Sequence, residues 1–138
     1  MESFVDLKII EETNYNIVYF KVNKIKLNIL KWTFFMNELK NTIELVKYSD
    51  KKIGFLFDIK NLSLIDIKYI KEFTTLMKEN GDLLEEKLLS TCVLDNTPNL
   101  KNFMEAIKLV YTTKKEIIFV KDNNDSKNIF LNQVKNTL

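Results

Sequence analysis

Two short runs of β-branched and aromatic residues lie near the beginning of the chain. They extend from Phe4 to Ile10 and from Ile17 to Val22, and the polar stretch EETNYN separates them. Such residues favour strands, and a short polar connection between two strands is typical of a hairpin. The sequence therefore predicts an antiparallel pair of strands here.

From Leu27 the apolar residues recur at steps of three and four positions, which is the period of a helix. They predict a long first helix with one apolar stripe facing the core. The stripe consists of Trp32, Phe35, Met36, Leu39, Ile43 and Val46. The next segment, IGFLFDI at 53–59, is apolar almost without interruption. Such a run is typical of a strand that is buried on both faces of a sheet.

A second helix is predicted after this strand, with Ile70, Phe73 and Met77 on one face. We expect it to end at Asn80 and Gly81, because glycine readily adopts the left-handed backbone conformation that closes a helix.

The rest of the chain continues the alternation of strand and helix. Strands are predicted at 88–95 and 115–120. Between them, Thr97 caps a helix and Pro98 takes its first position, where the missing N–H of proline costs nothing. Another capped helix ends the chain. The residues expected to face inward from these two helices are Leu100, Phe103, Met104, Ile107, Tyr111, Ile129, Phe130 and Val134.

The order of elements is thus β-β-α-β-α-β-α-β-α, which predicts an α/β fold. Helical crossovers make successive strands parallel, so the core strands form a parallel sheet and the first strand is their antiparallel neighbour. The chain has 138 residues and contains no linker rich in Pro, Gly or Ser. We therefore expect residues 1–138 to form a single domain, with a mixed sheet and helices packed on it.

Composition argues against several classes of function. The chain has no histidine and no arginine, and its formal charge is only +2. Histidine-based catalysis and histidine metal sites are therefore excluded. Without arginine and without a strong positive charge, nucleic acid is not an expected partner. We expect no cofactor and no metal.

The chain is expected to be cytoplasmic, without insertion into a membrane. Its first residues, MESFVDLKII, begin a strand and lack the apolar stretch of a signal peptide. No apolar run approaches the roughly 18 residues that a membrane-spanning helix needs.

An enzyme is the weakest of the functions considered. Cys92 lies in the apolar stretch LLSTCVL and is therefore expected to be a small buried residue. A catalytic role for its thiol is not expected, because no histidine can activate it. Asp58, Asp66 and Glu72 offer carboxylates for acid–base work, and Asp58, Asp66 and Asp95 offer ligands for a divalent metal at strand ends. No glycine-rich loop follows any predicted strand, which argues against nucleotide or Mg²⁺ binding.

At residues 55–70 the sequence resembles the STAS domain family (sulphate-transporter and anti-sigma-factor-antagonist domains). Family members have a buried strand that ends in aspartate, a polar turn, a hydrophobic pair, and then Asp-Ser-Ser-Gly at the start of a helix. The later segment and the element order resemble the SpoIIAA-like branch. The resemblance implies a non-enzymatic domain that binds or regulates another protein. The residues that match the pattern are Asp58, Asn61, Ile65 and Asp66.

The sequence departs from this family at the phosphorylation site. In the anti-sigma-factor-antagonist branch, a Ser or Thr directly after the motif Asp is phosphorylated, and this controls binding to a kinase. Ile67 and Lys68 occupy those positions here, and Tyr69 replaces the motif glycine. Ser63, upstream of Asp66, is the nearest alternative hydroxyl. We therefore expect the phosphorylation switch to be absent or displaced.

The start of the second helix is the predicted partner-binding surface. Ser63 and Asp66 form the pattern S-x-x-D of a capping box, in which the serine oxygen accepts a hydrogen bond from the Asp66 backbone N–H. STAS-like domains contact partners at this helix start, and aromatic residues are enriched at the centres of interfaces, which makes Tyr69 prominent. The residues of this surface are Leu62, Ser63, Asp66, Ile67, Lys68 and Tyr69.

Two further functions remain open. Phe34 and Leu45 lie outside the buried stripe of the first helix. If exposed, they predict self-association, as in a homodimeric structural or assembly protein; the alternative is that a terminal segment covers them. The abundance of Phe, Ile and Leu, together with the likeness of SpoIIAA-like folds to lipid-binding domains, favours a carrier of a lipid or another apolar small molecule.

Overall fold

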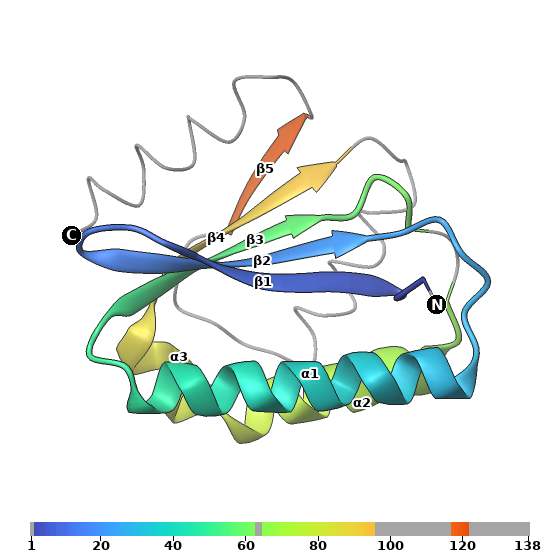
Figure 1. Ribbon diagram of the computed structural model, residues 1–138, viewed down its shortest axis with the longest axis horizontal. Helices are drawn as coiled ribbons and strands as arrows, with labels where there is room; N and C mark the ends of the chain where they lie inside the picture. Colours follow the sequence, from blue (N-terminus) through green and yellow to red (C-terminus); the bar gives the residue numbers. More distant parts are fainter. Residues whose placement is uncertain (1, 63–64, 96–116, 122–138) are drawn as a thin grey trace.

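The computed structural model describes residues 2–62, 65–95 and 117–121, which form a five-stranded sheet and three helices (Figure 1). The strands follow one another in the sheet in the order β1-β2-β3-β4-β5. β1 and β2 are antiparallel, and every later pair of neighbours is parallel. The strands are β1 (Val5–Glu11), β2 (Tyr15–Val22), β3 (Lys52–Asp58), β4 (Leu88–Asp95) and β5 (Ile117–Lys121).

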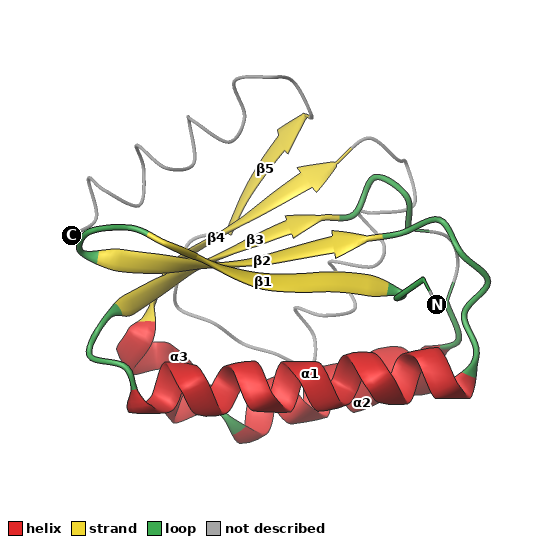
Figure 2. Ribbon diagram, viewed as in Figure 1, coloured by secondary structure: helices red, strands yellow, loops and turns green. Residues whose placement is uncertain are grey.

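The three described helices are α1 (Ile29–Tyr48), α2 (Ile67–Glu79) and α3 (Gly81–Lys87), and Figure 2 shows them on one side of the sheet. The strand order explains this placement. The crossovers from β2 to β3 and from β3 to β4 each lead to the next strand in the same direction, and right-handed crossovers that advance in one direction lie on one face. None of these three helices combines the length and the apolar character that crossing a membrane requires.

The α/β fold and the mixed sheet are confirmed. The predicted hairpin is present, with Val5 paired to Val22 and Glu11 paired to Asn16. The strand predicted at 88–95 has the same bounds in the structure, and the last strand spans Ile117–Lys121 rather than 115–120. The helix predicted to begin at Thr97 and the terminal helix lie outside the described residues.

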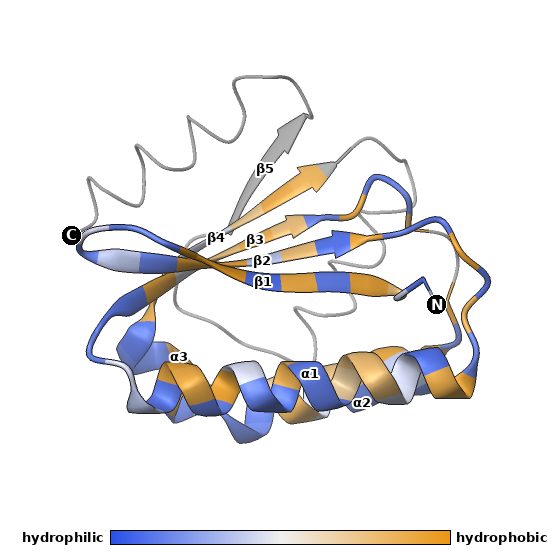
Figure 3. Ribbon diagram, viewed as in Figure 1, coloured by the Kyte–Doolittle hydropathy of each residue, from blue (hydrophilic) through white to orange (hydrophobic). Residues whose placement is uncertain are grey.

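The helix side of the sheet carries the larger part of the core. All six residues of the predicted α1 stripe are buried there, as expected from their spacing. They pack against buried side chains of the strands, among them Val5, Phe20 and Phe55. Figure 3 shows β4 as hydrophobic along most of its length, which fits a central parallel strand covered on both faces.

The second face of the sheet is also apolar. Phe55 belongs to the helix-side core, whereas its neighbour Leu56 belongs to a separate cluster and is completely buried. The prediction that 53–59 is buried on both faces is therefore confirmed. The buried members of the second cluster are Tyr15, Ile17, Leu56, Leu89, Cys92 and Leu94.

The predicted end of the second helix at Asn80 is confirmed, but its predicted cause, a left-handed Gly81, is wrong. α2 ends with Asn80, whose backbone N–H donates to the carbonyl oxygens of Leu76 and Met77. Gly81 does not adopt a left-handed conformation, since no described glycine has a positive φ. It opens α3 instead, because the Asn80 carbonyl accepts a hydrogen bond from the Leu84 N–H at 3.0 Å and the Leu84 side chain is buried.

Candidate functional site

Asp66 fixes the start of α2. Its side-chain Oδ1 accepts a hydrogen bond from the Lys68 backbone N–H at 3.0 Å, and its carbonyl accepts one from Tyr69 N–H at 3.0 Å. Asp66 is thus the N-cap, and its carboxylate faces the positive end of the helix. The predicted capping box, with Asp66 inside the helix, is wrong because the first helical residue is Ile67. Ser63 lies outside the described residues.

Replacing Asp66 with alanine should lower the free energy of unfolding by about 1 kcal/mol, because the N-cap hydrogen bond and the dipole interaction are both lost. Urea denaturation of the two proteins measures this difference. Asp66→Asn is the matched control, since an asparagine oxygen can still accept from Lys68 N–H and should retain most of the stability. Equal stability of wild type and Asp66→Ala would contradict the capping role.

The three residues after Asp66 have different environments. The Ile67 side chain is 64% exposed and is an apolar group presented to solvent at the first helical position. The Lys68 Nζ lies 5.1 Å from the centre of the Tyr69 ring, within range of a cation–π contact. Tyr69 is only half exposed, because its ring packs on Trp32 at a centroid distance of 4.9 Å. The exposed apolar contact is therefore Ile67, whereas Tyr69 supports it.

Trp32 joins α1 to the start of α2. Its side chain is buried, and its Nε1–H donates a hydrogen bond to Glu72 Oε2 at 3.0 Å. The ring packs against Tyr69 from α2, so one tryptophan makes both a polar and an aromatic contact with the neighbouring helix. Glu72 is exposed on α2, and the local sequence gives no indication that Trp32 is its partner. These contacts hold the α2 start at a fixed position relative to α1.

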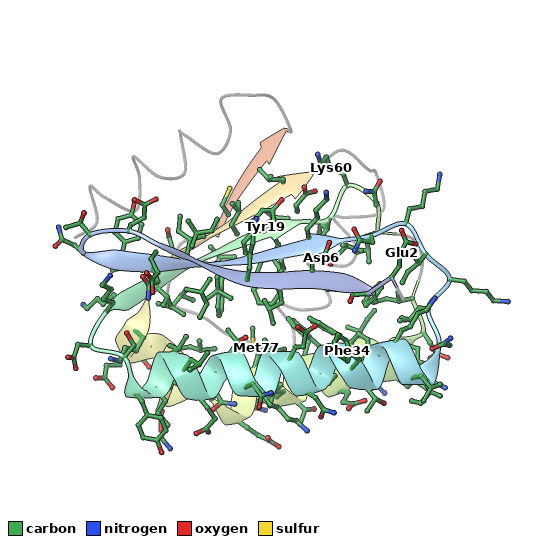
Figure 4. The ribbon with its side chains drawn as sticks, in the orientation of Figure 1. Glu2, Asp6, Tyr19, Phe34, Lys60 and Met77 are labelled. Atoms are coloured by element: carbon green, nitrogen blue, oxygen red, sulfur yellow. The ribbon has the colours of Figure 1, made fainter. Side chains whose placement is uncertain are left out.

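A cavity of about 80 Å³ lies between the sheet and the helices, beneath the start of α2. Among the described residues that line it, Thr74 and Thr91 carry the hydroxyl groups, and the Thr74 hydroxyl donates to the Lys71 carbonyl within α2. Figure 4 shows Met77, which also lines the cavity, between the helices and the sheet. A cavity of this character excludes water and accepts apolar groups. Its hydrophobic lining includes Phe20, Phe35, Phe55, Phe57, Leu62 and Ile65.

Asp58, at the end of β3, is bound by neighbours on the other face of the sheet. Its Oδ2 accepts a hydrogen bond from the Tyr19 hydroxyl at 3.3 Å and lies 3.6 Å from Lys60 Nζ. Figure 4 shows Tyr19 and Lys60 on the side of the sheet away from α1. Nowhere in the described ranges do three His, Cys, Asp or Glu side chains gather as a metal site would require. The Asp95 side chain lies outside the description, so the metal-binding trio of Asp58, Asp66 and Asp95 stays a prediction.

Cys92 is completely buried in the second apolar cluster, as predicted for a small apolar residue. Burial disfavours the charged thiolate and raises the pKa of the Cys92 thiol from 9.0 to about 12. A thiol with this pKa is protonated at neutral pH and does not act as a nucleophile.

The same shift predicts how stability depends on pH. Between about pH 9 and about pH 12 the thiol ionises in the unfolded chain but not in the folded one, so rising pH favours unfolding. The stability advantage of the wild type over Cys92→Ala should therefore shrink across this range and be constant at lower pH. Urea denaturation of both proteins at several pH values measures it, and a pH-independent difference would contradict the buried neutral thiol.

Phe34 and Leu45 are both exposed, at 53% and 62%. The alternative that a terminal segment covers them stays a prediction, because residues 122–138 lie outside the described residues. Figure 4 shows Phe34 on α1. Two more large apolar residues of the same helix, Leu30 and Tyr48, are exposed at 73% and 77%. The sequence-based prediction did not include Leu30 and Tyr48, although their spacing from Phe34 and Leu45 places all four residues on one face of α1.

A scan against protein-family models finds no match to the chain, and a search of curated proteins finds none. The structure agrees with the STAS resemblance only in its α/β fold and mixed sheet. Membership of the STAS family therefore stays a prediction.

Proposed function

We propose that the protein is a non-enzymatic, STAS-like interaction domain that binds a protein partner through the start of α2. The observation that carries the proposal is the exposed Ile67 side chain on a helix start that Asp66 caps and Trp32 holds in place. A fixed apolar group needs little ordering when it binds, which favours affinity. The contact residues would be Leu62, Asp66, Ile67, Lys68 and Tyr69, together with Ser63, which lies outside the described residues.

The chemistry of this surface indicates the kind of partner. Ile67 would enter an apolar recess, and the Lys68 ammonium beside it would meet a carboxylate at the rim of that recess. Tyr69 would contribute the edge of its ring while it remains packed on Trp32. Because Ile67 and Lys68, and no Ser or Thr, directly follow Asp66, binding through this surface would not be switched by phosphorylation at the family position.

Capture from the native host with tagged protein, followed by calorimetry with the purified partner, tests the proposal. Ile67→Glu should abolish binding, because it places a charge in the apolar recess and leaves the buried residues untouched. Ile29→Glu is the matched control, since it makes the same change at a similarly exposed isoleucine that is likewise the first residue of its helix, α1. A partner that binds wild type and Ile67→Glu with equal affinity would rule out this surface.

A second candidate function, that of a carrier for a small apolar molecule, is favoured by the cavity. The lining is almost wholly hydrophobic, so a bound molecule would be uncharged and without strong hydrogen-bonding groups. An engineered cavity of about 150 Å³ with a similar lining takes up benzene or xenon. NMR shifts of the cavity-lining methyl groups on addition of xenon or benzene test this candidate, and the absence of any shift would exclude it.

A further inference from the structure

The outward side of α1 carries a line of residues without any charge. At 100° per residue, its members fall within about a quarter of a turn of one another, opposite the buried stripe. The four apolar ones are among the most exposed large hydrophobic residues of the described chain. The charged residues of α1 lie to either side of this line, whereas a solvated helix normally carries charges in the middle of its outer face. The members are Leu30, Phe34, Asn37, Asn41, Leu45 and Tyr48.

The order of apolar and polar residues along this outward line is almost the same in both directions. Its centre is Leu39, which itself points into the core. The apolar residues form two separate patches, one near each end of the helix, and the two asparagines lie between them. Each position has a counterpart of the same character at a nearly equal distance on the other side of the centre. The counterparts are Leu30 with Tyr48, Phe34 with Leu45, and Asn37 with Asn41.

We infer that the outward line of α1 binds the same line of a second copy of this chain, with the two helices antiparallel about a two-fold axis near Leu39. In a two-fold interface, residue i of one copy contacts residue j of the other while j contacts i. About an axis near Leu39, this places each apolar residue of the outward line against its apolar counterpart, and the two asparagines against each other. Each apolar patch then covers the opposite patch of the other copy. This arrangement accounts for there being two patches rather than one.

The asparagines would set the register of this pair. In the antiparallel arrangement the amide of Asn37 lies opposite that of Asn41 in the other copy, and each amide has both donors and an acceptor. A polar residue at such a position fixes the alignment of two helices, because a shifted register leaves its hydrogen bonds unmade. A parallel pair would instead place Phe34 against Phe34 and would gain nothing from the symmetry of the pattern.

The charge of α1 also favours a second copy as the occupant, and its size sets the expected strength of the dimer. A 20-residue helix is about 30 Å long, and a single helix face buries less area than the standard interface of about 800 Å² per partner. We therefore expect a reversible dimer with a dissociation constant of about 1–100 µM. A membrane surface is the less suitable occupant, since α1 has three lysines and two glutamates and no polybasic face.

Sedimentation equilibrium over a range of concentrations tests the dimer. The mass of the wild type should rise from monomer to dimer, and Phe34→Lys and Leu45→Glu should each remain monomeric. An equimolar mixture of these two variants should dimerise again, because in the antiparallel pair the introduced lysine faces the introduced glutamate. Ile67→Glu is the control that should dimerise like the wild type, since Ile67 is equally exposed but lies on α2.

Three results would overturn the inference. The first is a monomeric wild type at every concentration. The second is a dimer that survives Phe34→Lys and Leu45→Glu but is lost with Ile67→Glu, which would move the interface to α2. The third is a mixture of the two α1 variants that stays monomeric, which would exclude the antiparallel pairing. Circular dichroism of each variant would confirm that it is folded.

Discussion

Replacing Trp32 with alanine is expected to lower the free energy of unfolding by about 3–5 kcal/mol. The indole is buried and contacts three aromatic rings, those of Phe4, Phe35 and Tyr69, at centroid distances of 6.1, 5.4 and 4.9 Å. Alanine would leave a void at the meeting point of β1, α1 and α2. It would also remove the hydrogen bond that the indole donates to Glu72.

Chemical denaturation measures the loss, and two controls separate its causes. Trp32→Phe retains a ring but lacks the N–H donor, so it should cost less than alanine. Phe34→Ala removes an exposed aromatic ring two positions away and should change the stability by less than about 0.5 kcal/mol at concentrations where the protein is monomeric. A loss below about 1 kcal/mol for Trp32→Ala would mean that this junction between the helices contributes little.

Phe20→Ala is the second substitution expected to have a large effect, again with a loss of about 3–5 kcal/mol. The Phe20 ring is buried, stacks on Phe57 at a centroid distance of 4.3 Å and meets Phe55 edge-on at 5.6 Å. It also lines the cavity, so its removal would enlarge a space that already exists. Because the cost of truncation grows with the volume of the cavity left behind, the loss should lie near the upper end of this range.

The enlarged cavity supplies a second measurement. Benzene should bind Phe20→Ala more tightly than the wild type, and should restore part of its lost stability because it binds only the folded state. Lys21→Ala, at the next position of β2 but exposed, should lose little stability and should respond to benzene like the wild type. A variant that is destabilised but gains nothing from benzene would show that the core had collapsed into the space.

The strands and α1 could be predicted because local periodicity determines them. The six-residue stripe of α1 extends over nearly four turns, which leaves no other period consistent with the sequence. α3 was missed because Gly81–Lys87 is shorter than two turns and has only Leu84 in the core. The end of the second helix was predicted correctly, but the left-handed Gly81 was wrong because this residue begins α3 instead. That helix depends on the burial of Leu84 against distant parts of the chain, which the local sequence does not indicate.

The candidate site was predictable in part. Asp66 and Ile67 could be located because capping chemistry and the resemblance both act over a few residues. The contacts of Trp32 with Tyr69 and Glu72 could not, since they depend on the distance and rotation between two helices that are far apart in the sequence. The cavity likewise could not be predicted, because it depends on how closely side chains from four strands and two helices pack together.

The sequential order of the strands bears on how the chain folds during synthesis. Every strand in the sheet pairs with the strand that precedes it in the chain, beginning with the β1–β2 hairpin. Each new strand therefore finds its binding edge already formed by residues that left the ribosome earlier, and no strand has to be inserted between two existing neighbours. Such a sheet can grow by addition at one edge, and each parallel addition closes one crossover to the strand before it. β1, which pairs antiparallel with β2, remains the opposite edge strand of the sheet throughout this growth.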